Sequence, residues 1–149
     1  MRSEEATQVA AILRAKGSQV ARASSKSRVA DAVKILNEQK IGAVLVTDDD
    51  RSVDGVLSER DIVHALAENG VDTLDLPVTG LMSRDVITCS EESSVDDLMR
   101  SMTEHRIRHL PVIKNDQLAG LISIGDVVKY RLDELEFERD AMRDYIATG

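Results

Sequence analysis

The sequence predicts a mixed α/β (α+β) fold built from two modules related by a pseudo-twofold axis. Each module is expected to be a small sheet with two helices, and an extended C-terminal helix follows the pair. Two observations predict this: helical apolar stripes alternate with short strand-like runs, and the pattern recurs 66 positions later (95 − 29). The expected divisions are 5–70 and 71–133 for the modules and 134–149 for the extension.

The repeat begins with two predicted helices. Apolar residues at positions 29, 32, 33 and 36 recur at 95, 98, 99 and 102. The i, i+3, i+4, i+7 spacing places each set on one face of a helix. Ser27 and Ser93 stand two residues before these stripes, and we expect them to be the N-caps.

A predicted β-hairpin follows each of these helices. The paired runs are 43–47 with 53–57, and 109–113 with 118–122. A further helix is expected after each hairpin, from Glu59 and from about Gly125. A helix at 7–16 is expected before the first copy, and a short helical turn at 78–82 at the start of the second.

The composition excludes several classes of function. The formal net charge is −8 and aromatic residues make up 2% of the chain, which disfavours binding to nucleic acid or to an anionic membrane. No apolar run is long enough to span a membrane. The single cysteine, Cys89, favours a reducing compartment, so we expect a cytoplasmic protein.

Two motifs of one kind follow the hairpins. Gly55, Ser58 and Asp61 form a Gly-x-x-Ser-x-x-Asp pattern that Gly120, Ser123 and Asp126 repeat. The pattern resembles the signature of CBS domains, named for cystathionine β-synthase, and the run 109–113 (HLPVI) resembles the second strand of that family. The resemblance implies a tandem (Bateman) module that binds AMP, ATP or related adenosyl ligands between its copies, and such modules commonly dimerise.

The residues of the motif suit a nucleotide, although a plain helix-capping role is the alternative. Ser58 and Ser123 would lie at helix N-termini, where phosphate is favoured. An ionised carboxylate suits the vicinal hydroxyls of a ribose. The resemblance assigns that role to Asp61 and Asp126, and a ribose with a 2′-phosphate should be disfavoured.

Phosphate needs a cationic partner, and positions 105–109 form the densest basic cluster. In the family, the polar pair before Leu-Pro-Val reaches phosphate, which here means Arg108 and His109. Arg60 is a second candidate, and His105 and Arg106 are weaker ones. The alternative is that these side chains are only a solvated strand edge and helix end.

For adenine, the family uses the first strand of each copy. The corresponding residues are Val20, Ala21, Arg22, Val86, Ile87 and Thr88, with Pro111 beside them. They serve equally well as plain core strands. With three histidines and one cysteine, the chain has no metal-ligand spacing, and we expect no metal.

The C-terminal segment predicts a long helix from Val127 to about Ile146. Its apolar residues form an a/d-like seam, interrupted at Arg139. This narrow seam indicates docking on a partner chain or a dimer mate. Packing on its own domain is an equally open interpretation.

The leading hypothesis is a non-catalytic regulatory module that senses an adenine nucleotide and signals to an unknown partner. AMP is the first candidate, with ADP, ATP or NADH as others, and a homodimer is expected. The first copy lacks the polar pair and the proline at 41–44 (IGAV), so the two clefts should differ. The rivals are a dinucleotide spanning both clefts, a structural dimerisation module with empty clefts, and an enzyme, for which we find no catalytic group.

Overall fold

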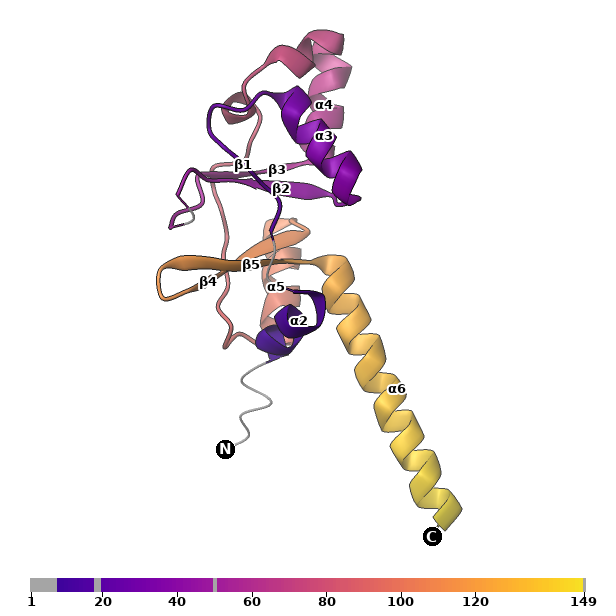
Figure 1. Ribbon diagram of the computed structural model, residues 1–149. Helices are drawn as coiled ribbons and strands as arrows, with labels where there is room; N and C mark the ends of the chain where they lie inside the picture. The colour runs from indigo at the N-terminus through magenta and orange to yellow at the C-terminus, as the bar shows by residue number, and fades with distance from the viewer. Residues whose placement is uncertain (1–7, 18–19, 50, 149) are drawn as a thin grey trace.

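The computed structural model describes residues 8–17, 20–49 and 51–148. Two small sheets lie one above the other between helices, and one long helix projects away from them (Figure 1). The expected α/β pair of modules with a C-terminal helix is therefore confirmed. The expected module boundary at residue 5, the helix start at Thr7 and the final residue of the extension lie outside the described residues.

The first module is a three-stranded sheet with two helices. Strand β1 (Arg22–Ala23) runs parallel to β2 (Ala43–Val46), which pairs antiparallel with β3 (Gly55–Ser58). Helix α3 (Val29–Gln39) connects β1 to β2, and α4 (Glu59–Asn69) follows β3. The predicted hairpin and both helices are confirmed.

The second module repeats this order with a reduced first strand. Helix α5 (Val95–His105) precedes the antiparallel pair β4 (His109–Lys114) and β5 (Gln117–Ser123), and α6 (Ile124–Thr148) follows. The expected first strand at 86–88 is wrong: only Cys89 forms a parallel bridge, with Val112. This bridge is the counterpart of the pairing between Ala23 and Val46 in the first module.

The predicted N-caps Ser27 and Ser93 are also wrong, each by one residue. The hydroxyl oxygens of Ser27 and Ser93 accept hydrogen bonds from the backbone N–H groups of Ser24 and Ser90, at 3.2 Å each, and so close the preceding turns. The N-cap of α5 is Ser94, whose hydroxyl accepts from the backbone N–H of Asp97. In α3 the cap position is Arg28.

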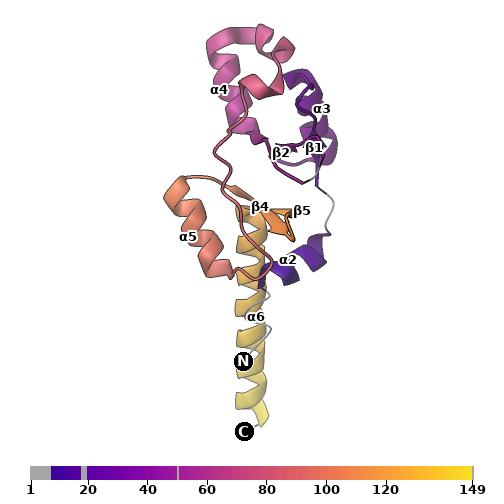
Figure 2. The same cartoon turned by 90° about the vertical axis from the view of Figure 1, so that its left-hand side faces the viewer.

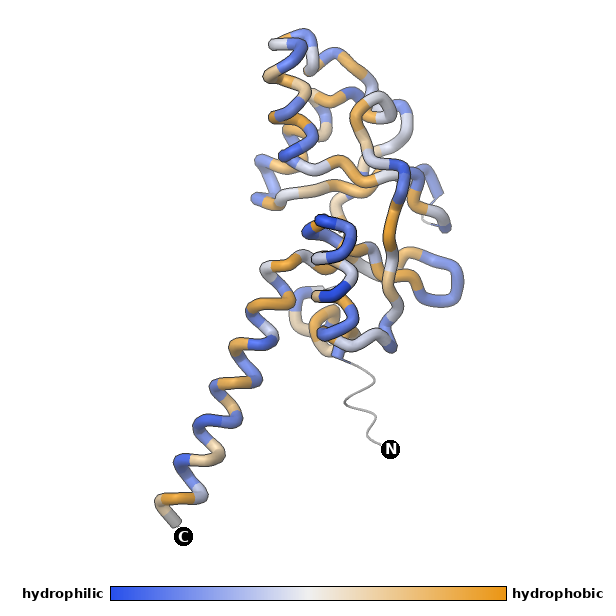
Figure 3. The backbone as a smooth tube through the Cα atoms, turned by 180° about the vertical axis from the view of Figure 1, so that it is seen from behind, coloured by the Kyte–Doolittle hydropathy of each residue, from blue (hydrophilic) through white to orange (hydrophobic). Residues whose placement is uncertain are grey.

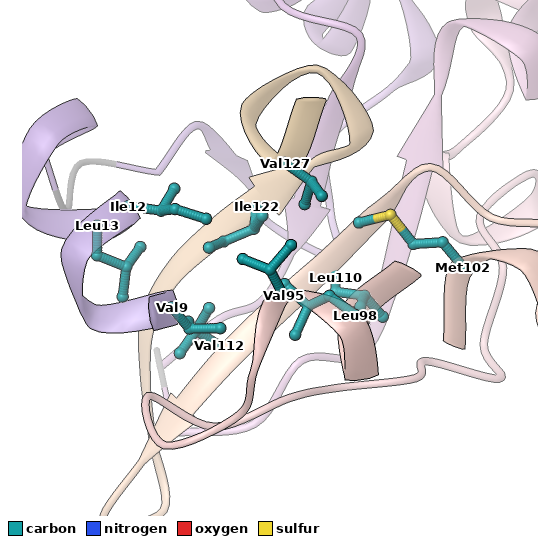
Figure 4. Packing of buried hydrophobic residues seen from close by; sticks show 10 residues of the cluster. All are labelled: Val9, Ile12, Leu13, Val95, Leu98, Met102, Leu110, Val112, Ile122 and Val127. Atoms are coloured by element: carbon teal, nitrogen blue, oxygen red, sulfur yellow. The ribbon is translucent and has the colours of Figure 1, made fainter. Parts of the chain in front are cut away.

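The segment before each module packs on the other module. Helix α2 (Gln8–Lys16) contributes Val9, Ile12 and Leu13 to the core of the second module (Figure 4). The side-chain oxygen of Gln8 accepts a hydrogen bond of 2.8 Å from the backbone N–H of Val95, at the start of α5.

The connection between the modules, which precedes the second module, packs on the first. It consists of two short 3₁₀ helices, η1 (Gly70–Asp75) and η2 (Val78–Gly80). Val78 and Met82 lie in the core of the first module, and backbone hydrogen bonds join Val29 to Leu76 and Val78 to Ser27. Figure 2 shows this connection running beside both modules. The boundaries at 70/71 and 133/134 stay a prediction.

Helix α6 leaves the body of the protein after about two turns. Val127 is buried and Arg131 pairs with Asp96 of α5, but from Leu132 to Ala147 every residue except Glu134 is exposed. The interpretation that this helix packs along its own domain is therefore wrong, and apolar residues continue along it to its end (Figure 3). Among the described residues, no helix is both long and apolar enough to cross a membrane.

Candidate functional site

In the first module, the motif serine and aspartate cap α4. Ser58 ends β3 and is the N-cap, and its hydroxyl accepts a hydrogen bond of 3.2 Å from the backbone N–H of Asp61. In return, the backbone N–H and the hydroxyl of Ser58 donate to Asp61 Oδ2, at 2.9 and 3.0 Å. The capping interpretation is thus confirmed for this pair, and all its carboxylate hydrogen bonds converge on Oδ2.

The second module repeats this cap at the start of α6 and adds a lysine. The backbone N–H of Asp126 donates to the hydroxyl of Ser123 (3.1 Å), and the backbone N–H of Ser123 donates to Asp126 Oδ2 (2.9 Å). Lys16, from the end of α2, places its Nζ 2.5 Å from the same Oδ2. Burial acts to raise the pKa of Asp126, but the hydrogen bonds from Lys16 and Ser123 outweigh it and hold that pKa below its ordinary value.

His109 lies where the two modules meet, next to this aspartate. It is the first residue of β4 and pairs with Ser123 across the hairpin. Its ring lies against Gly42 of the first module, beside the carboxylate of Glu59: a β-carbon added to Gly42 would be 3.4 Å from Glu59 Oε1 and 3.5 Å from His109 Nε2. Gly42 of the apolar first-module stretch therefore leaves room for the imidazole, and Glu59 of α4 places a carboxylate beside it.

Burial lowers the pKa of His109 below 6.5, and the positive charge of Lys16 acts in the same direction. The carboxylates of Asp126 and Glu59 oppose the shift without cancelling it. At neutral pH the imidazole is therefore uncharged. The phosphate contact predicted for His109 would then be a hydrogen bond from a neutral ring and not an ion pair.

This shift makes the protein less stable in mild acid. The unfolded chain takes up a proton at His109 near pH 6.5, whereas the folded chain does so only at lower pH. The contribution of His109 to stability is fully present above that pH and is lost as the pH falls through the folded-state pKa. Between pH 7.5 and 5.5, thermal melts should show a smaller drop in melting temperature for His109→Gln than for the unsubstituted protein. His64→Gln, at an exposed site on α4, is the control, and equal drops in all three proteins would contradict the expectation.

The predicted cations are exposed and are spread over both modules. Arg60 lies in the first turn of α4, and Arg108 precedes β4, where its carbonyl oxygen accepts a hydrogen bond from the backbone N–H of Ile124. His105 ends α5, and Arg106 is its left-handed C-cap residue with φ of 55°. Of these predicted cations, Arg108 is the one whose charge acts on His109, so the structure brings Arg108, His109, Asp126 and Ser123 together.

Two hollows stand out on the surface that the structure describes, and neither is lined by Asp61 or Asp126. One, of about 260 Å³, lies between the modules at the hairpin turns, and Val86 and Thr88 of the predicted adenine slot line it. The other, of about 490 Å³, lies between α3 and α4 of the first module. The hollow between the modules is lined by Arg51, Ser52, Val53, Val86, Thr88, Ile113 and Asp116. The ribose role of the two aspartates therefore stays a prediction.

The other predicted adenine residues divide between core and surface. Ala21 packs against the core of the first module and Ile87 against that of the second. Pro111 is buried in β4, and Val20 is half-buried, whereas Arg22 is exposed. Their binding role also stays a prediction.

Cys89 is not set up for chemistry. Burial raises the pKa of its thiol to about 12, so the thiol stays protonated at neutral pH. Within the ranges that the structure describes, no three His, Cys, Asp or Glu side chains gather to hold a metal ion.

The structure is a pseudo-symmetric pair of strand-and-helix modules, and each module ends its hairpin in a serine–aspartate cap. The family model described as "CBS domain" matches residues 18–68 and 78–133. The chain belongs to the CBS-domain family, as a tandem pair.

Solved and curated relatives agree with this assignment. The CBS-domain containing protein ATU1752 from Agrobacterium tumefaciens is 44% identical, with a TM-score of 0.80 over 84% of this chain and 99% of that one. The mitochondrial CBS domain-containing protein CBSX3 of Arabidopsis thaliana is 30% identical over 97% of this chain and 74% of its own length. The CBS domain pair of protein MJ0100 was solved in complex with 5′-methylthioadenosine and S-adenosyl-L-methionine. It is 27% identical to this chain, with a TM-score of 0.72, over 83% of this chain and 98% of that one.

Sequence reasoning missed two charged residues of this site, Lys16 and Glu59. Lys16 lies outside the 66-residue repeat, so no internal comparison points to it. Glu59 occupies a variable position of the motif, where Ile124 stands in the second copy. The sequence signal for Glu59 is a carboxylate in the first turn of the helix that follows the motif serine, where α4 begins beside the second module.

Proposed function

We propose that this chain is a non-catalytic regulatory module that binds an adenine nucleotide between its two copies, with AMP as the first candidate and ADP, ATP or NADH as others. Membership of the CBS-domain family supports the proposal, as does the MJ0100 pair, whose two ligands both contain adenosine. Occupancy would shift the arrangement of the two modules only if the ligand binds one arrangement better than the other.

One observation carries the proposal for this chain. In both modules the capping hydrogen bonds go to Oδ2 of the motif aspartate, so the cap does not use Oδ1. Capping and ribose binding are therefore compatible at Asp61 and at Asp126. Arg108 and His109, next to Asp126, support a phosphate position in the second module.

Calorimetric titration with AMP, ADP, ATP and NADH tests this proposal. Asp61→Asn and Asp126→Asn keep a capping oxygen but lose the charge, and each should weaken binding at its own cleft by roughly ten- to a hundred-fold. Asp97→Asn is the matched control, because Asp97 is the third residue of a capped helix but lies outside the motif. Absence of binding up to millimolar nucleotide, or equal affinity in all four proteins, would rule the proposal out.

A structural dimerisation module with empty clefts is the second candidate. The observation that favours it is that neither aspartate lines either hollow. A ligand that binds only the folded state must raise the melting temperature. A melting temperature that millimolar nucleotide leaves unchanged would favour this second candidate. The homodimer and the partner that would cover α6 stay predictions.

A further inference from the structure

Lys16 forms an ion pair with the motif aspartate of the second module, Asp126, and not with that of the first module, Asp61. Its ammonium lies 2.5 Å from Asp126 Oδ2 and donates a second hydrogen bond of 2.7 Å to the carbonyl oxygen of Leu121. Both acceptors belong to the end of β5 and the start of α6, whereas the lysine ends α2. Figure 1 shows the end of α2 beside the start of α6.

Among the residues that the structure describes, the first module has no such contact. Leu13 of α2 lies against Gly120, and Met82 of the connection lies against Gly55 in the same way. Lys16 follows Leu13 in the last turn of α2, whereas the chain after Met82 is not helical and its nearby ionisable residue Asp85 is an acid and not a lysine. Across the residues that the structure describes, the carboxylate of Asp61 is held only by Ser58 and by no cation.

This ion pair competes with a ribose for the same carboxylate. Oδ2 accepts two hydrogen bonds in each module, but at Asp61 both come from Ser58, whose hydroxyl can rotate to another acceptor, whereas at Asp126 one comes from the Lys16 ammonium. A diol that takes both carboxylate oxygens therefore has to displace a cation only at Asp126. The pair is accessible to such a competitor, because 34% of the Lys16 side chain and 24% of the Asp126 side chain are exposed. Partly exposed ion pairs are weak enough to exchange with a ligand.

We propose that Lys16 is an intramolecular competitor for Asp126, which makes the second cleft the weaker of the two for a nucleotide that binds through its ribose. The inference rests on the proposed function and adds its regulation: a ligand at the second cleft must break the Lys16 bridge between the end of α2 and the start of α6, and a ligand at the first cleft has no ion pair to break. The two clefts are thus filled in order, Asp61 first.

The test is titration of AMP into proteins in which Asp61→Asn leaves Asp126 as the only motif carboxylate. In that background, Lys16→Met keeps the apolar stem and removes the charge, and it should tighten AMP binding about two- to five-fold. Lys16→Gln is the second variant and should act in the same direction. Lys34→Met, at an exposed site on α3, removes the same charge and should leave the affinity unchanged.

The outcomes separate this inference from the proposed function. If AMP binds and Asp126→Asn abolishes binding, but Lys16→Met leaves it unchanged, the competitor role fails and the proposed function stands. Weaker binding in Lys16→Met overturns the competitor role, because Lys16 would then contact the ligand. If no protein in the series binds AMP, ADP, ATP or NADH, both fail together.

Discussion

Leu13→Ala should lower the free energy of unfolding by about 2–3 kcal/mol, because it empties a buried site at which α2 holds the second module. Leu13 is 7% exposed and belongs to the core cluster that also contains Val95 and Ile122. Urea denaturation followed by circular dichroism measures the loss. A loss below about 0.5 kcal/mol would show that α2 does not pack on this module in solution.

A double-mutant cycle with Gly120 makes this expectation sharper. A β-carbon at Gly120 would lie 2.5 Å from Leu13 Cδ2, so Gly120→Ala alone overpacks the site. Once Leu13 is alanine, the added methyl group enters vacated space, and the double variant should be more stable than additivity predicts by at least about 0.5 kcal/mol. Leu98→Ala combined with Gly120→Ala is the control and should be additive. Additivity in the Leu13 cycle would contradict the contact.

Gly55→Ala should lower the free energy of unfolding by roughly 1–3 kcal/mol, and by more than Gly120→Ala does. An added β-carbon would meet Met82 Sδ at 2.5 Å and the carbonyl oxygen of Ser83 at 2.9 Å. A side-chain end can move aside, but Ser83 is held by two backbone hydrogen bonds to Val56, of 2.9 and 3.0 Å. At Gly120 only the end of Leu13 is in the way.

Thermal and urea unfolding of the two glycine variants measure this difference. Gly80→Ala is the matched control, since the nearest atom to an added β-carbon there is 4.0 Å away, and it should be neutral within about 0.5 kcal/mol. If Gly120→Ala proved the more damaging change, the bridge between Val56 and Ser83 would not be the rigid element inferred from the structure.

The elements that the sequence predicted best are those with a local physical signal. Apolar spacing located α3 and α5, and the Ser58 and Asp61 pair located the start of α4, because a capping box joins residues only three apart. The caps at Ser27 and Ser93 were missed by one residue. The backbone N–H groups of Ser24 and Ser90 donate to the hydroxyls of Ser27 and Ser93 instead. Such local competition for a hydrogen bond, and not residue type alone, decides where a helix begins.

The repeat could not predict that α2 packs on the second module and that the inter-module connection packs on the first. Periodicity shows that Val9, Ile12 and Leu13 share a helix face, but not which of two similar cores buries that face. For the same reason the ion pair of Lys16 with Asp126, which joins residues 110 positions apart, had no local signal. The strand expected at 86–88 failed because a parallel pairing depends on a distant partner, here Val112.

The position of Asp126 has a mechanical consequence. It lies in the first turn of α6, a helix of 25 residues and therefore about 37 Å long. Because most of that helix extends beyond the globular body, it is a lever whose base is held by Val127 and by the pair of Arg131 with Asp96. By simple geometry on that length, a tilt of about 10° at the base would sweep the far end through roughly 6 Å, so a small change in the orientation of the first turns, where Asp126 lies, would be magnified at Tyr145 and Ile146.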